Sequence, residues 1–150
     1  YMPRKLPDHS RLLLFYLKDL LPKNWKIIPL INITEKKLID TLSISKIFIS
    51  FSNFEGLGIP PIEAALSGNK VIGYVGGGGK EYWKKPIFIK VENGEIEDFA
   101  KKIIKNIKSY KDSWIRNTKK NRLHLSSRYS KKSEKESLIL LSNKILEFFD

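Results

Sequence analysis

The sequence contains no cysteine and only two histidines, His9 and His124. The absence of cysteine excludes disulfides, iron–sulfur clusters and thiolate zinc sites, and it is compatible with a cytosolic location. The two histidines are far apart and form neither an HxH nor an HxxxH spacing, so ligands for a transition metal are scarce. We therefore expect no metal cofactor, and we expect both histidines to be surface residues.

Long apolar runs are also lacking. No stretch approaches the roughly 18 uninterrupted apolar residues of a membrane span, and no charged segment followed by an apolar run marks a signal peptide. The 150 residues, 41% of them hydrophobic, are enough for one core of ordinary size. We expect a single domain over residues 1–150, and because the first residue is Tyr1 we expect it to belong to a longer protein.

Acidic residues are few beside basic ones, which leaves a formal net charge of +12. Such a charge attracts anions: nucleic acid, phospholipid, nucleotide diphosphates or acidic glycans. Lysine greatly outnumbers arginine, as an AT-rich genome would also produce. One interpretation is a non-enzymatic basic module for nucleic acid or an anionic surface, centred on residues 119–135. Because no nucleic-acid-binding motif is present and aromatic residues are not interleaved with basic ones, we do not expect a nucleic-acid partner.

Short apolar runs alternate with amphipathic segments along most of the chain. Runs without a polar face are typical of strands covered on both sides in a parallel sheet. These predicted strands are residues 25–31, 46–51, 71–75 and 87–91, with Tyr1 and Met2 ending an earlier one. The predicted helices are residues 11–21, a short helix after the N-cap Thr34, residues 60–67, and further helices from Glu95 onward.

Apolar residues at helical spacing predict which side of each helix packs on the core. In the first two helices these residues are Leu12, Phe15, Tyr16, Leu20, Leu38, Ile39 and Leu42. A similar stripe on the last helix consists of Leu138, Leu141, Ile145, Leu146 and Phe149. The alternation of strands and helices predicts an α/β fold, a doubly wound parallel sheet with helices on both faces, followed by C-terminal helices. Ligands bind such sheets at the carboxyl ends of the strands, so the site should lie in the loops after Phe51 and Val75.

Residues 55–63 combine two carboxylates, two glycines and two prolines where a buried strand meets a helix. Gly56 and Gly58 permit close approach of the backbone to a ligand, and a helix begun by proline turns its positive end toward an anion. Glu63, in the first turn, is placed to accept hydrogen bonds from a vicinal diol such as a ribose. Glu55, on the loop, has the same capacity toward a sugar.

Together these residues resemble the E-x7-E motif of retaining glycosyltransferases with the two-domain GT-B architecture, typified by glycogen and sucrose synthases. The likeness extends over residues 46–74, which are similar to the family's strand, loop, helix and strand unit. Residues 77–81, GGGKE, resemble the GGxxE loop that follows, and Arg128-Tyr129-Ser130 is similar to a closing Arg-Phe-Ser segment.

The resemblance implies roles for individual residues. Glu63 would bind the ribose and Glu55 the hydroxyls of the transferred sugar, where it orients the donor at the catalytic centre without acting as a base. Arg4 stands where the family has an arginine for the diphosphate, and Lys5 or Arg11 would substitute for the usual lysine. Backbone amides of Gly77, Gly78 and Gly79 would face the diphosphate or sugar, and Ile31 and Asn32 would lie against the base.

The resemblance also implies a function. The chain would be the donor-binding half of a glycosyltransferase that moves a sugar from a nucleotide-diphosphate sugar to a glycan or lipid-linked acceptor, in bacterial surface polysaccharide synthesis. An N-terminal half outside this chain would bind the acceptor, so the chain alone would be inactive. No metal would be needed, and the expected location is cytoplasmic, with the basic helices available for peripheral contact with an anionic inner membrane face.

Overall fold

The computed structural model describes the backbone of residues 1–149 and the side chains of residues 1–145. Its centre is a sheet of three parallel strands in the order β1-β2-β3. The strands are β1 (Ile47–Ser52), β2 (Lys70–Val75) and β3 (Phe88–Lys90). The predicted α/β class with a parallel sheet is thereby confirmed, and the predicted strands 46–51 and 71–75 agree with β1 and β2 to within one residue.

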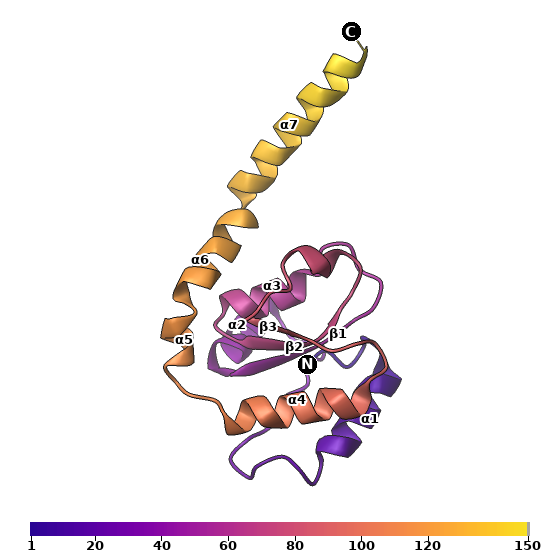
Figure 1. Ribbon diagram of the computed structural model, residues 1–150, viewed down its shortest axis with the longest axis vertical. Helices are drawn as coiled ribbons and strands as arrows, with labels where there is room; N and C mark the ends of the chain where they lie inside the picture. Colours follow the sequence, from indigo (N-terminus) through magenta and orange to yellow (C-terminus); the bar gives the residue numbers. More distant parts are fainter. Residues whose placement is uncertain (150) are drawn as a thin grey trace.

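Helices cover both faces of this sheet (Figure 1). On one face lie α1 (Pro7–Leu17) and α4 (Ile96–Lys108), which pack on each other. On the opposite face lie α2 (Glu35–Ile44), α3 (Ile59–Leu66) and α6 (Lys119–Arg128). The short 3₁₀ helix η1 (Gly78–Glu81) follows β2, and α5 (Trp114–Asn117) precedes α6.

The core is divided by the sheet into two layers, because successive side chains of a strand point to opposite faces. Ile49 and Phe51 pack with α1 and α4. There the rings of Phe51 and Tyr74 meet edge to face, and both contact the ring of Phe99 at a tilt. Phe48 faces the other way and packs with α3 and Leu125 of α6. Burial on both sides explains why the strands are mostly apolar in sequence and have no polar face.

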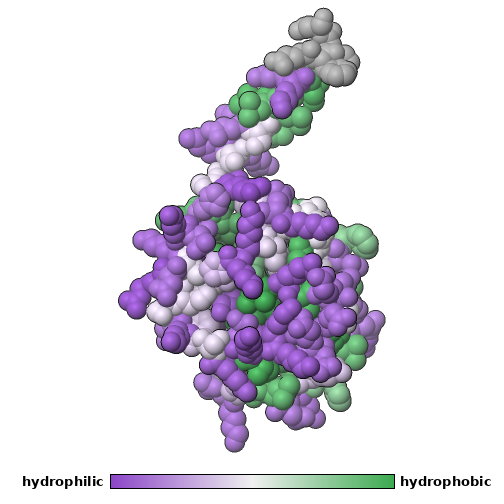
Figure 2. Space-filling view, viewed as in Figure 1, coloured by the Kyte–Doolittle hydropathy of each residue, from purple (hydrophilic) through white to green (hydrophobic). Residues whose placement is uncertain are grey.

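The last helix, α7 (Lys131–Phe149), extends away from the body of the domain (Figure 1). Leu138, Leu141 and Ile145 of its predicted apolar stripe are exposed, and Figure 2 shows apolar surface on this projecting arm. The side chains of Leu146 and Phe149 lie outside the described residues. Within the part of the chain that the structure describes, no helix is both long and apolar enough to cross a bilayer.

The first helix differs from the prediction in its bounds and in its buried side. Pro7 starts α1, so the helix begins and ends four residues earlier than predicted. It buries Leu13 and Leu17, while the predicted core residues Leu12, Phe15, Tyr16 and Leu20 are exposed. The run Leu12–Leu17 is apolar on every side, so periodicity could not decide which side faces the core. Ile39 of α2, also predicted to point inward, is exposed, whereas Leu42 is buried.

The predicted strand 25–31 and the strand ending at Met2 are not formed as regular strands. Tyr1 alone connects them: its α-amino group donates to the carbonyl of Ile28 at 3.2 Å, and its carbonyl accepts from the amide of Leu30 at 2.8 Å. A parallel strand depends on backbone partners along its length, and the described chain supplies this pairing at one residue only. The predicted strand 87–91 is likewise shorter, as β3.

The N-cap of α2 is the one that the sequence predicts. Thr34 is extended and its hydroxyl oxygen accepts from the amide of Lys37 at 3.3 Å. We expect Thr34→Ala to lower the free energy of unfolding by about 1 kcal/mol, because one amide of the first turn loses its acceptor. Thr34→Ser keeps the acceptor and should stay close to the parent in urea unfolding. Equal losses in both variants would show that the hydroxyl is not the cause.

Candidate functional site

Two loops meet at the carboxyl ends of β1 and β2, as the sequence predicts for a parallel sheet. The amide of Gly78 donates to the carbonyl of Glu55 at 3.0 Å, which fastens the segment after β2 to the loop 53–58. Asn93, after β3, donates through Nδ2 to Oδ1 of Asn53 at 3.2 Å. The ends of all three strands are therefore tied together on one side of the sheet.

Two glycines of this region are explained by packing. A Cβ added to Gly78 would lie 1.5 Å from the carbonyl oxygen of Gly56, so the two loops touch backbone to backbone. Gly58, at the N-cap of α3, has a φ of 71°, a left-handed conformation that glycine adopts without strain. The structure thus gives these glycines a role in shaping the loops, and contact with a ligand remains a prediction.

Glu55 connects the loop 53–58 with the segment that precedes α1. Its side chain is 18% exposed, and Oε1 forms an ion pair with Nζ of Lys5. Its Oε2 accepts from the hydroxyl of Ser52, the last residue of β1, at 3.3 Å. Of the three basic residues predicted near a diphosphate, Lys5 is the one in contact with this loop, since Arg4 is exposed and Arg11 pairs with Asp8.

Glu63 lies on α3, one residue beyond the first turn in which it was predicted. The helix begins at Ile59, so Glu63 is in its second turn and no acidic residue stands in the first. Its neighbours Ile62, Ala64 and Ala65 are buried against the sheet side, while Glu63 is exposed. The carboxylate is thus directed to solvent. Glu55 and Glu63 stand on either side of the start of α3.

The remaining predicted contacts are spread over other segments. Ile31 and Asn32 are exposed in the segment before α2, and Asn32 has a left-handed φ of 47°. Gly77 is exposed and Gly79 is buried at the start of η1. Trp83 is partly buried and packs against the second core layer.

Comparison with known proteins identifies the family. A family model described as glycosyl transferases group 1 matches residues 9–121, which is well over half of the chain. The chain belongs to this family. No curated protein and no solved structure matches it. Membership assigns the domain to a glycosyltransferase.

The family match covers part of the candidate site of this glycosyltransferase domain. It includes both loops at the carboxyl ends and the whole of α3, and it begins after Arg4 and Lys5. It also ends before Arg128, whose Nη2 lies 2.9 Å from Oε2 of Glu81. This ion pair fastens the end of α6 to the GGGKE segment. Lys5 and Arg128, both outside the matched range, therefore contact this region through ion pairs with Glu55 and Glu81.

Two residues of the site were not predicted. The hydroxyl of Tyr82 donates to the carbonyl of Gly58 at 2.9 Å, and burial raises the pKa of Tyr82, so the phenol stays a neutral donor. His9, predicted to be a surface residue, is partly buried and its Nδ1 lies 3.0 Å from the hydroxyl of Tyr74. That prediction was wrong for His9, whereas His124 is exposed. Neither contact leaves a local pattern in the sequence.

The Tyr82 hydroxyl should support the loop that carries Glu55. We expect Tyr82→Phe to cost about 1 kcal/mol of unfolding free energy, because the carbonyl of Gly58 loses its donor. Tyr129→Phe is a matched control: the Tyr129 hydroxyl is buried without a hydrogen-bond partner in the described part of the chain, so its removal should be neutral or stabilising. Thermal unfolding of the two variants measures the difference, and equal losses would contradict the assigned role.

Proposed function

We propose that this domain is the donor-binding half of a retaining glycosyltransferase, with residues 55–63 as its E-x7-E motif, similar to glycogen and sucrose synthases. The observation that carries the proposal is the placement of Glu55 and Glu63 on either side of the start of α3, at the carboxyl ends of the strands. Ligands of doubly wound sheets bind at this edge. The donor is a nucleotide-diphosphate sugar.

Each polar group near this edge has a proposed role. Glu63, which is exposed, binds the ribose diol, and Glu55 orients the hydroxyls of the transferred sugar. Lys5, whose side chain is 41% exposed, keeps its ion pair with Glu55 while its ammonium group attracts the diphosphate. Arg4 adds charge from the same segment. Basic side chains and backbone amides neutralise the departing diphosphate, so the proposal requires no metal.

The reaction breaks the bond between the anomeric carbon and the diphosphate oxygen, and the electron pair leaves with the nucleotide. An acceptor hydroxyl forms the new bond on the same face of the sugar, and its proton passes to the departing phosphate or to a base outside this chain. Glu55 is not that base in our proposal: its oxygens contact Lys5 and Ser52, and their remaining acceptor sites bind hydroxyls of the sugar. Its contribution is to hold the sugar in place.

The acceptor is a glycan or a lipid-linked saccharide, held by an N-terminal half that is not part of these residues. Synthesis of a bacterial surface polysaccharide fits the excess of positive charge, since lipid-linked acceptors lie beside anionic membranes. The exposed basic residues of α6 and the first turn of α7 would face such a membrane. Alone, the domain should bind its donor without transferring sugar.

A calorimetric titration with UDP-, GDP- and dTDP-sugars tests the proposal. We expect one of these nucleotide sugars to bind with a stoichiometry of one and to remain unhydrolysed. Inorganic pyrophosphate at the same ionic strength is the control for attraction by charge alone. If no nucleotide sugar binds more tightly than pyrophosphate, the donor-binding role is wrong for this domain.

A further inference from the structure

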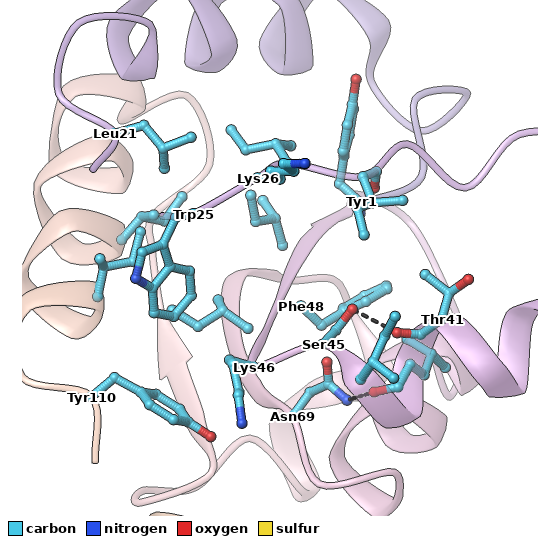
Figure 3. Close-up of a pocket in the computed structure, with 18 of the residues that line it drawn as sticks. Tyr1, Leu21, Trp25, Lys26, Thr41, Ser45, Lys46, Phe48, Asn69 and Tyr110 are labelled. Atoms are coloured by element: carbon cyan, nitrogen blue, oxygen red, sulfur yellow. Dashed lines mark hydrogen bonds between the residues drawn. The ribbon is translucent and has the colours of Figure 1, made fainter. Parts of the chain in front are cut away.

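Two cavities of this domain differ in charge. The larger, of about 600 Å³, lies along the outer edge of β1, with Tyr1 and Trp25 on one side and Lys46 on the other (Figure 3). Its Lys46 is paired with Asp112 at 3.3 Å. The smaller, of about 340 Å³, lies between α6 and the segment 81–88, on the opposite face of the sheet from α1 and α4. We call this second cavity the α6 cavity.

The rim of the α6 cavity is basic. It carries three exposed rim lysines, Lys84 and Lys85 from the segment before β3 and Lys120 from the first turn of α6. None of the three forms an ion pair within the part of the chain that the structure describes. Glu81, the only carboxylate among the described lining residues, is already paired with Arg128 at 2.9 Å. Four cations and one carboxylate leave a formal charge of +3 around one small cavity, which favours an anion between them.

The floor of the α6 cavity is aromatic and apolar. The rings of Tyr82 and Tyr129 meet edge to face with centroids 5.8 Å apart, and Tyr82 meets Phe88 in the same way at 5.2 Å. Ile87 and Leu125 complete this floor. A ligand that fills the cavity would meet cations at the rim and carbon beneath them. Such a lining suits an anionic group attached to an apolar body.

Tyr129 belongs to the floor and also reaches the charged rim. The Cζ atom of Arg128 lies 5.6 Å from the centroid of the Tyr129 ring, so this ring and Glu81 together hold the guanidinium. The Tyr129 hydroxyl is buried and has no hydrogen-bond partner among the described residues. Burial raises the pKa of Tyr129, so the hydroxyl stays a neutral donor. A buried donor without an acceptor is costly, and an oxygen of a bound ligand would satisfy it.

We propose that the α6 cavity binds the headgroup of an anionic phospholipid, with the phosphate among the rim lysines and the Tyr129 hydroxyl, and the start of the acyl chains against the aromatic floor. The charge of the rim selects an anion, and the apolar floor selects a lipid over a free phosphate. Duplex nucleic acid is the competing partner. It would need a long row of cations along its backbone, whereas these lysines surround one small cavity.

This proposal rests on the membrane contact in the proposed function and makes it specific. Attraction by charge alone brings a basic domain to an anionic membrane without fixing its orientation. A lipid held in the α6 cavity would fix that orientation, with exposed Lys131 and Lys132 at the start of α7 beside neighbouring headgroups. The rim lysines are not part of the proposed donor site. If the domain binds no nucleotide sugar and still binds the lipid, the donor proposal fails and this one stands.

The two histidines provide a local test, because His124 lines the α6 cavity whereas His9 contacts Tyr74 in the other core layer, at 3.0 Å. In a proton NMR titration with dihexanoylphosphatidylglycerol below its micelle concentration, we expect the imidazole signals of His124 to shift and those of His9 to stay in place. Glycerophosphate should need a concentration about tenfold higher, because it leaves the apolar floor uncovered. Equal affinity for the two compounds, or no shift of His124, overturns the lipid site.

Alanine at all three rim lysines tests whether they act at one site. We expect this triple variant to bind vesicles of phosphatidylglycerol and phosphatidylcholine about tenfold or more weakly. The matched control removes the same charge from the opposite face of the sheet, with alanine at the exposed Lys18, Lys105 and Lys108, and should bind nearly as well as the parent. Equal losses in both triple variants would show general attraction by charge. That result, or tighter binding of duplex DNA than of these vesicles at the same ionic strength, contradicts the proposal.

Tyr129→Phe tests the hydroxyl without changing the charge. The ring that packs on Tyr82 and Arg128 is kept, so we expect the variant to unfold at the temperature of the parent or slightly above. Its affinity for dihexanoylphosphatidylglycerol should fall by about tenfold, because a hydrogen bond to a charged phosphate is lost. Unchanged affinity would place the phosphate away from Tyr129 and overturn the site as proposed.

Discussion

A methyl group on Gly78 is expected to force apart the two loops that carry the proposed donor site. In Gly78→Ala the new Cβ would lie 1.5 Å from the carbonyl oxygen of Gly56, so one backbone must move. Movement is opposed by the bond from the Gly78 amide to the carbonyl of Glu55 at 3.0 Å. We expect a loss of about 1–3 kcal/mol in unfolding free energy. Nucleotide affinity should fall as well, because Glu55 moves with its loop.

Gly56→Ala is the matched control for this prediction. It adds the same methyl group to the facing loop, where nothing lies within 4 Å of the new Cβ. Its unfolding free energy in urea should stay within about 0.5 kcal/mol of the parent. If Gly56 approaches the donor, as the sequence predicts, this variant should bind nucleotide more weakly while remaining stable. Equal stability of the two variants would show that the loops do not meet at Gly78.

The central part of the fold could be predicted because its signals are local. β1 and β2 are mostly apolar and almost fully buried, and Gly68, left-handed with a φ of 98°, follows the end of α3. Parallel strands bring their carboxyl ends to the same edge of a sheet, so the sequence alone predicts that the loops after β1 and β2 lie together. The bounds of the N-terminal elements were less predictable. The segment 24–30 pairs with Tyr1 only, and strand pairing between segments so far apart in the sequence leaves no local signal.

The contacts within the site could not be predicted for the same reason. Glu55 and Lys5 are fifty residues apart in the sequence, and nothing local to either predicts their ion pair. Tyr82 reaches the carbonyl of Gly58 across the turn formed by η1. Sequence spacing predicts which residues carry the chemistry, whereas the structure shows the contacts that hold them. Glu63 was predicted in the first turn of α3 but lies in the second, because the helix begins at Ile59, ahead of the two prolines.

Glu63→Ala should separate donor binding from stability more cleanly than any other change at the site. Glu63 is exposed, so its removal should alter the unfolding free energy by less than about 0.5 kcal/mol. If it binds the ribose diol, losing hydrogen bonds to a charged acceptor costs about 1.5–3 kcal/mol of binding free energy. Affinity for the nucleotide sugar should then fall by roughly 10- to 100-fold. Isothermal titration calorimetry measures this directly.

A second variant of equal charge provides the control, because the proposed donor is an anion and the domain is strongly basic. Glu63→Ala raises the formal net charge from +12 to +13, and so does Glu134→Ala at an exposed residue in the first turn of α7. Attraction by charge alone would strengthen donor binding slightly in both variants. If Glu63 contacts the donor directly, Glu63→Ala should bind it more weakly, whereas Glu134→Ala should not. If the two variants bind equally, Glu63 does not contact the ribose, even where the parent domain binds the donor.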